Sequence, residues 1–82
     1  MSTTKHINLY YKFKKFKDHW SPKVIAEMND YQFKLAKIKG KFIKHQHTET
    51  DEVFIVVEGD MSIEFKTETI EIKSGEMIVV PK

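Results

Sequence analysis

GKFIKHQHTETDEVFIVVEG occupies residues 40–59, and this stretch decides how the rest of the chain is interpreted. His45 and His47 are two residues apart, a spacing that puts both imidazoles on one face of a β-strand. Glu52 comes five residues after His47, which leaves room for a turn and the start of a partner strand. Two neutral imidazoles and a carboxylate are suitable ligands for a divalent transition metal. The stretch therefore predicts a metal site at His45, His47 and Glu52.

Short β-strands separated by polar turns are predicted for most of the chain after residue 22. Tyr31, Phe33 and Leu35 alternate with polar residues, as expected of a strand with one buried face. Residues 52–57 are apolar on both faces, so this strand should be central and covered on both sides. The strands are expected over residues 24–28, 31–38, 42–47, 52–57, 61–65, 70–73 and 77–80, with Tyr31, Phe33, Phe54 and Phe65 in the core.

One short helix is predicted before the strands, over residues 9–17. Asn8 is a suitable N-cap, and Leu9, Phe13 and Phe16 follow at the i, i+4, i+7 spacing of one helix face. Trp20-Ser21-Pro22 should end this segment, because a residue before proline is disfavoured in a helix. A front helix followed by many short strands indicates an antiparallel sandwich or barrel.

Length and composition limit the possible classes of protein. The 82 residues are enough for one domain, with a tail and helix over 1–22 and the barrel strands over 23–82. Cysteine is absent, which excludes disulfides and thiolate metal sites and favours a cytoplasmic location. The longest apolar run is Val53–Val57, and the first twenty residues are polar and rich in Lys, so no membrane partner is expected.

Charge is distributed unevenly along the chain. Residues 1–44 carry eleven Lys and three acids, a net charge of +8, whereas residues 45–82 carry three Lys and nine acids, a net charge of −6. The simpler interpretation is attraction between neighbouring strands or protomers. The alternative is a basic face for nucleic acid or anionic lipid. All basic residues are Lys, whereas bidentate recognition of phosphate or guanine favours Arg, so no nucleic-acid partner is expected.

Residues 40–82 resemble the cupin superfamily. The first cupin motif, a Gly, then His-x-His, Glu and Gly, matches Gly40, His45, His47, Glu52 and Gly59, with one residue fewer than usual between Gly40 and His45. The second motif begins at Gly75 and reaches Pro81-Lys82. The front half also resembles small single-domain cupins that are often labelled as mannose-6-phosphate isomerase relatives.

The resemblance implies a mainly β fold, an antiparallel double-stranded β-helix (cupin or jelly-roll) barrel with a short N-terminal helix. It also implies that the fourth metal ligand, a His of the second motif, and the closing strands would lie beyond Lys82, which leaves this barrel incomplete. Either the chain is a fragment of a longer cupin, or a partner chain supplies the closing strand. Residues 77–80 then form a candidate open edge, and a homodimer, with or without exchanged strands, would cover it.

The predicted function is that of a small metal-binding cupin. Three protein ligands leave positions open for water or substrate, and iron, manganese, nickel, zinc and copper are all compatible with them. The protein is either an enzyme or a former enzyme, and if active it would be an isomerase or a dioxygenase acting on a small oxygen-rich molecule. The alternative is a metal-free cupin that acts as a small-ligand binding or dimerisation module. Residues 49–51 are interpreted as a solvated loop, and His6 and His19 as surface or helix-packing residues.

Overall fold

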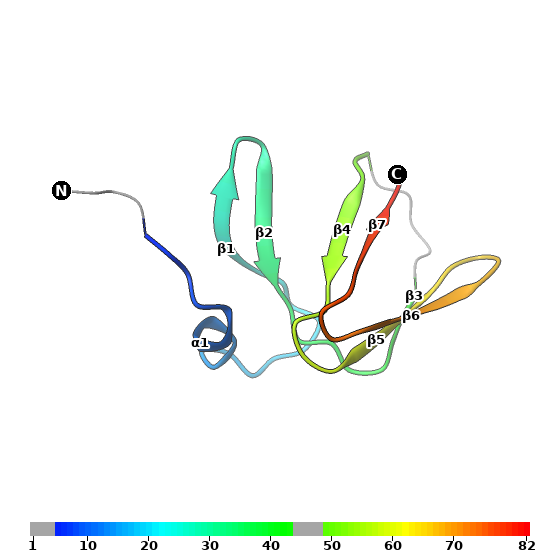
Figure 1. Cartoon of the computed structure of the whole chain (residues 1–82), viewed down its shortest axis with the longest axis horizontal. Helices are drawn as coiled ribbons and strands as arrows, with labels where there is room; N and C mark the ends of the chain where they lie inside the picture. The colour runs from blue at the N-terminus through cyan, green and yellow to red at the C-terminus, as the bar shows by residue number, and fades with distance from the viewer. Residues whose placement is uncertain (1–4, 44–48) are drawn as a thin grey trace. The chain divides into compact units, whose positions relative to one another are not determined.

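The computed structural model describes residues 5–43 and 49–82, which belong to two compact units, Met1–Lys39 and Gly40–Lys82 (Figure 1). The described residues form one short helix and seven strands, so the chain is mainly β, as the sequence predicts. No helix in the described ranges is long and apolar enough to cross a membrane.

The first unit opens with helix α1 (Leu9–Phe13). Asn8 has extended backbone angles, and its Oδ1 accepts a hydrogen bond from the Tyr11 N–H at 2.9 Å, so it caps the helix as expected. The predicted length of the helix, residues 9–17, was wrong. Lys14 is the C-cap, and its N–H is shared between the carbonyls of Tyr10 and Tyr11, which tightens the last turn and ends the helix there.

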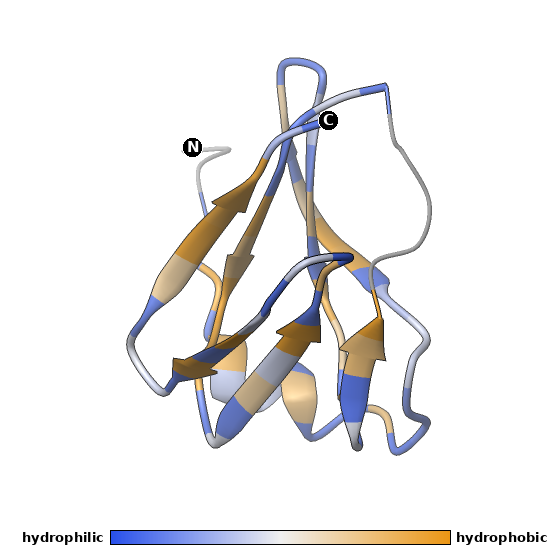
Figure 2. Cartoon of the chain, turned by 90° about the vertical axis from the view of Figure 1, so that its right-hand side faces the viewer, coloured by the Kyte–Doolittle hydropathy of each residue, from blue (hydrophilic) through white to orange (hydrophobic). Residues whose placement is uncertain are grey.

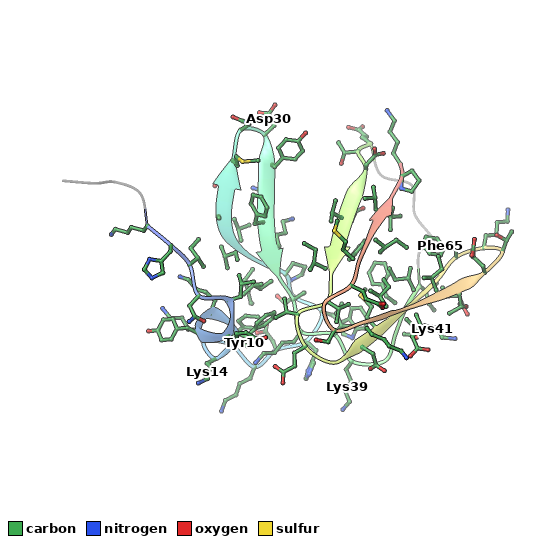
Figure 3. All side chains as sticks on the ribbon, viewed as in Figure 1. Tyr10, Lys14, Asp30, Lys39, Lys41 and Phe65 are labelled. Atoms are coloured by element: carbon green, nitrogen blue, oxygen red, sulfur yellow. The ribbon has the colours of Figure 1, made fainter. Side chains whose placement is uncertain are left out.

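A hairpin of strands β1 (Lys23–Met28) and β2 (Tyr31–Leu35) follows in the same unit. The strands pair antiparallel with an irregularity between Val24 and Ala26, which is the position of a β-bulge. The turn uses Asn29 at φ 54°, a left-handed conformation that Asn tolerates, and the neighbouring Asp30 stands at the hairpin tip (Figure 3).

The prediction that Tyr31 and Phe33 are core residues was wrong. Their exposed fractions are 66% and 48%, and the buried apolar residue of this hairpin is Leu35 at its base. The alternation of β2 was interpreted correctly as a strand with one apolar face. Among the described residues of the first unit, however, no layer covers that face around Tyr31 and Phe33.

The second unit contains two small sheets. Strand β3 (Lys41–Ile43) pairs parallel with β5 (Asp60–Glu64), which pairs antiparallel with β6 (Thr69–Lys73). The parallel pair differs from the all-antiparallel prediction. It is possible because the connection between β3 and β5 is long and contains a strand of the other sheet, whereas a tight turn permits only antiparallel pairing. That strand is β4 (Glu52–Ile55), which pairs antiparallel with β7 (Met77–Val80).

The core of the second unit comes from strands of both sheets. Ile63 is completely buried at the centre of β5, where it pairs with Phe42 on one side and with Ile70 on the other. Phe54 and Phe65, which the sequence places in the core, are half-buried. The other buried apolar residues of this unit are Val56, Met61, Ile72 and Val80.

Two sets of hydrogen bonds fix the ends of the β4–β7 pair. At one end, the Gly75 N–H donates to the Val56 carbonyl at 2.8 Å, and Gly75 adopts φ 84°, which favours glycine. At the other end, the Lys82 N–H donates to Asp51 Oδ1 at 3.0 Å. The two strands are therefore held in register on either side of Glu52–Ile55.

Candidate metal centre

Glu52 is the member of the predicted ligand set that the structure describes. It is the first residue of β4, is half-buried, and lies opposite Val80 of β7. Because successive side chains of a strand point to opposite faces, Glu52 shares one face of the β4–β7 pair with Phe54, Ile78 and Val80. Val80 is only 3% exposed, so we call this face the inner face of the pair.

The inner face of β4 is directed toward strand β3. The rings of Phe54 on β4 and Phe42 on β3 are tilted against each other, with their centroids 5.5 Å apart. Glu52 thus projects from the same face as a side chain that packs against β3, the strand immediately before the His45–His47 segment. A metal site built from β4 and from the His45–His47 segment that follows β3 requires its carboxylate ligand on this face.

His45 and His47 lie outside the described residues, so their convergence on Glu52 stays a prediction. Among residues 5–43 and 49–82, no three His, Cys, Asp or Glu side chains are grouped closely enough to hold a metal ion. A metal site that includes Glu52 therefore depends on the two histidines and not on further described residues.

The remaining polar residues that the sequence singled out lie at the surface. Glu49, Thr50 and Asp51 are exposed, as expected of a solvated loop. His6 and His19 are exposed too, which agrees with their interpretation as surface residues.

The contact between Phe42 and Phe54 beside Glu52 was not predicted from the sequence. The alternation that places Phe54 on the same face as Glu52 was available, but it could not show which strand that face meets. Phe42 belongs to a strand that pairs parallel with β5, and sequence periodicity does not show such a pairing.

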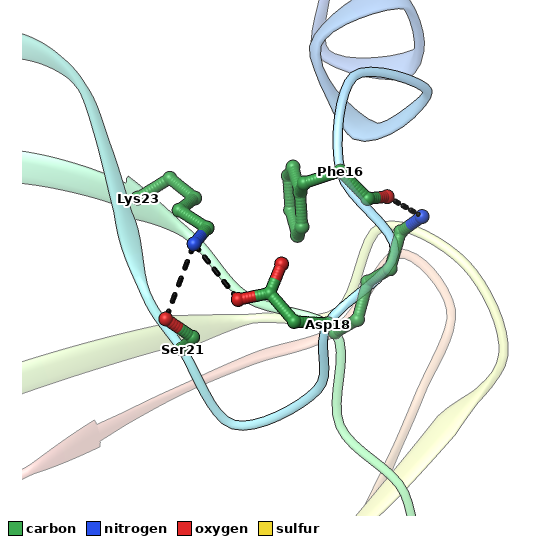
Figure 4. A network of polar contacts seen from close by, with 5 residues as sticks. Phe16, Asp18, Ser21 and Lys23 are labelled. Carbon is green, nitrogen blue, oxygen red and sulfur yellow. Dashed lines mark hydrogen bonds and ion pairs between the residues drawn. The ribbon is translucent and has the colours of Figure 1, made fainter.

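A polar cluster in the first unit holds the segment between α1 and β1 (Figure 4). The Lys23 ammonium donates to Asp18 Oδ2 at 2.8 Å and to Ser21 Oγ at 3.2 Å, and the Lys37 ammonium donates to the Phe16 carbonyl. The two ammonium groups lie 5.7 and 5.0 Å from the centre of the Phe16 ring, within the range of cation–π contacts. The cluster orders the loop through its own internal bonds.

The same cluster changes the acidity of Asp18. The hydrogen bond from Lys23 lowers the pKa of this carboxyl from its ordinary value of 3.8, and Ser21 acts in the same direction. Both partners of the ion pair are well exposed, so solvent screens the pair. We interpret the cluster as a local structural element.

Comparison with known proteins gives the family. No family model matches the chain. The uncharacterized protein YdbB of Bacillus subtilis (strain 168) is 41% identical over 59 residues, which are 71% of this chain and 52% of that protein. The chain thus spans about half the length of this relative.

A solved structure is more similar. The crystal structure of a cupin-2 domain containing protein from Shewanella frigidimarina NCIMB 400 matches with a TM-score of 0.86 and 58% sequence identity. The match covers 93% of this chain and 74% of that chain. The chain belongs to the cupin-2 domain family, and its fold is the cupin fold, as the motif around residues 40–59 indicates.

Proposed function

We propose that this protein is a metal-binding cupin in which His45, His47 and Glu52 hold one divalent transition metal. The observation that carries the proposal is the position of Glu52 on the inner face of β4, beside the Phe54 ring that packs against β3. The first cupin motif supplies two imidazoles a few residues before this carboxylate, and the chain belongs to the cupin-2 family.

The three proposed ligands are chemically suited to a divalent transition metal. Two neutral imidazoles and one carboxylate are ligands for iron, manganese, nickel, zinc or copper, and they leave coordination positions for water or an organic ligand. The Glu52 carboxylate offsets part of the cation's charge. The apolar residues that share its face, Phe54, Ile78 and Val80, make the surroundings of the carboxylate less polar than water.

The proposed organic ligand is a small oxygen-rich molecule, such as a sugar or a keto acid. When bound, the metal would polarise an oxygen atom of this ligand or, for iron, support oxygen chemistry, which are the bases of isomerase and dioxygenase activity. The part of this chain in that process is to hold the metal through three side chains and to keep open positions for the ligand.

Thermal unfolding of chelator-treated protein with added metal tests the ligand set. A metal that binds the folded chain at about 100 times its Kd stabilises it by about 2.7 kcal/mol. For a chain of this size that free energy corresponds to a Tm increase of roughly 10–20 °C. Glu52→Gln should lose most of the increase. The matched control is Glu49→Gln, which changes an exposed carboxylate in the adjacent loop and should keep it.

Two results would contradict the proposal. One is a Tm that none of the five metals raises. The other is an increase of equal size in the wild type and in Glu52→Gln, which would place the metal elsewhere.

A further inference from the structure

The two sheets of the second unit have apolar faces that meet beside Glu52. Phe42, Ile63 and Ile70 are cross-strand neighbours, so they lie on one face of the β3–β5–β6 sheet. This face meets the inner face of the β4–β7 pair at the contact between the Phe42 and Phe54 rings, two residues along β4 from Glu52. We call these two faces together the inner surface of the unit.

Glu52 differs in character from the rest of the inner surface. By strand alternation, every other residue that the described strands β3–β7 place there is apolar. The polar residues of the β3–β5–β6 sheet, such as the Lys41–Ser62 pair, lie on its opposite face. Among the described strand positions, the inner surface therefore has no hydroxyl or amide side chain that could hydrogen-bond to the hydroxyl groups of a sugar.

Part of the inner surface is accessible close to Glu52. Phe42, Phe54 and Ile78 are half-buried, and Ile78 lies directly opposite Phe54 on the neighbouring strand. These three side chains present apolar surface on the side of β4 to which Glu52 points. A molecule whose oxygen atoms were held next to Glu52 would bring its remaining atoms within reach of this surface.

The opposite face of the β4–β7 pair is apolar too, and it provides matched control positions. The exposed fractions of Val53, Ile55, Met77 and Val79 are 55%, 64%, 57% and 55%. We call this the outer face. Figure 2 shows β7, the strand that ends beside the C-terminus, as apolar over most of its length. The prediction that the strand at 52–57 is covered on both sides was wrong for this face, which the described residues of the second unit leave uncovered.

The composition of the inner surface discriminates between classes of ligand. A hydroxyl group that leaves water for an apolar surface without a hydrogen-bond partner loses free energy. An apolar group placed on the same surface gains free energy in proportion to the area that it removes from water. The inner surface thus disfavours a sugar and favours a molecule with oxygen atoms at one end and an apolar group at the other.

We propose that the organic ligand of the metal site is an oxygen chelator that carries an apolar group, such as a keto acid with an alkyl or aromatic side chain, and is not a sugar. This inference rests on the proposed metal site and names the class of molecule that the site accepts. The keto and carboxylate oxygens bind the metal held by Glu52, and the apolar group contacts Phe54 and its neighbours Phe42 and Ile78.

Calorimetric titration with pyruvate, phenylpyruvate and mannose tests the inference on the full chain, loaded with the metal that raises its Tm most. Pyruvate and phenylpyruvate offer the same keto and carboxylate oxygens and differ by a phenyl group. Phenylpyruvate should have a Kd at least tenfold lower than that of pyruvate, and mannose should bind more weakly than either. A tenfold ratio is equivalent to about 1.4 kcal/mol, the burial of about 60 Å² of apolar surface, which is less than an aromatic side chain buries.

Two variants of adjacent residues on β7 locate the contact. Ile78→Thr, on the inner surface, should reduce the ratio of the two Kd values at least threefold, because it exchanges apolar atoms for a hydroxyl. Val79→Thr makes a similar exchange on the outer face and should keep the ratio. Circular dichroism and the Tm increase with metal show that each variant is folded and holds its metal.

The outcomes separate this inference from the proposed function. Metal-dependent binding in which pyruvate is as tight as phenylpyruvate, or mannose is tighter than both, would overturn the inference and leave the metal site supported. Equal ratios in folded Ile78→Thr and Val79→Thr would overturn it as well. A Tm that no metal raises would overturn the proposed function, and this inference with it.

Discussion

Ile63 has the lowest exposed fraction of the core side chains in the described part of the chain. It is completely buried, and its strand is paired on both sides, with Phe42 and with Ile70 as neighbours. Ile63→Ala removes three carbon atoms, worth about 0.8 kcal/mol each in transfer free energy. The cavity left between two fixed strands adds to this, so we expect a loss of about 3–4 kcal/mol. Ile63→Val, which removes one carbon atom, should cost about 1 kcal/mol.

Urea unfolding followed by circular dichroism measures these losses. An 82-residue domain has an unfolding free energy of roughly 4–12 kcal/mol. The Ile63→Ala variant will therefore stay folded enough for its unfolding free energy to be measured only if the wild type lies in the upper part of that range. Ile63→Val is therefore the more reliable variant, with an expected midpoint shift of about 0.5–1 M. Ile43→Val is the matched control, because Ile43 is on the paired strand and 52% exposed, and it should cost about half as much. Equal losses in the two Val variants would refute the assignment of the core.

Three further predictions follow from the local geometry. Gly75→Ala should lower the free energy of unfolding by about 1–2 kcal/mol, because Gly75 has φ 84°, a left-handed conformation that alanine disfavours. An added Cβ would meet no neighbour, so the whole cost comes from the backbone conformation. An unchanged urea midpoint would contradict this. Lys23→Met should raise the pKa of Asp18 back toward 3.8 in an NMR titration. Because the pKa of Asp18 is lowered, its ion pair with Lys23 stabilises the fold at pH values above the ordinary pKa and loses this effect as the pH falls through the lowered pKa. Equal Asp18 pKa values in the wild type and in Lys23→Met would contradict the pairing. Asn8→Ala should speed hydrogen exchange at the Tyr11 amide, which Asn8 caps at 2.9 Å, whereas Asn8→Asp should retain protection; equal exchange in both would exclude the cap.

Much of the β structure could be predicted from the sequence. The alternation of apolar and polar residues placed the strands that are observed as β5 and β6 to within one residue at each end, and the apolar run after the Ser74-Gly75 turn placed β7. The turn at Asn29 was predicted from its tolerance of positive φ, which the structure confirms. Such features are local, because side-chain periodicity and backbone preference are properties of a few neighbouring residues.

Three features that side-chain periodicity does not contain were not predicted correctly. The end of helix α1 at Phe13 could not be read from its apolar spacing, which continues to Phe16. The exposure of Tyr31 and Phe33 depends on which layer covers the hairpin, and the strand alternation does not contain that information. The parallel pairing of β3 with β5 is likewise a matter of topology.

The candidate site was predicted in part. The motif identified the family correctly, and strand alternation placed Glu52 and Phe54 on the same face. The pairing of β4 with β7, which makes that face an inner one, brings together residues far apart in the sequence. The role of His45 and His47 stays a prediction that an experiment on the metal must test.

The metal content of the purified protein tests the central claim most directly. It would be measured by plasma mass spectrometry on protein prepared without chelators and then incubated with iron, manganese, nickel, zinc or copper. The account predicts close to one metal ion per chain in the wild type and loss of that metal in the folded His45→Ala/His47→Ala variant, with His6→Ala/His19→Ala as the matched control that keeps it. Absence of metal from the wild type after all five incubations, or equal metal in the wild type and the His45→Ala/His47→Ala variant, would contradict it.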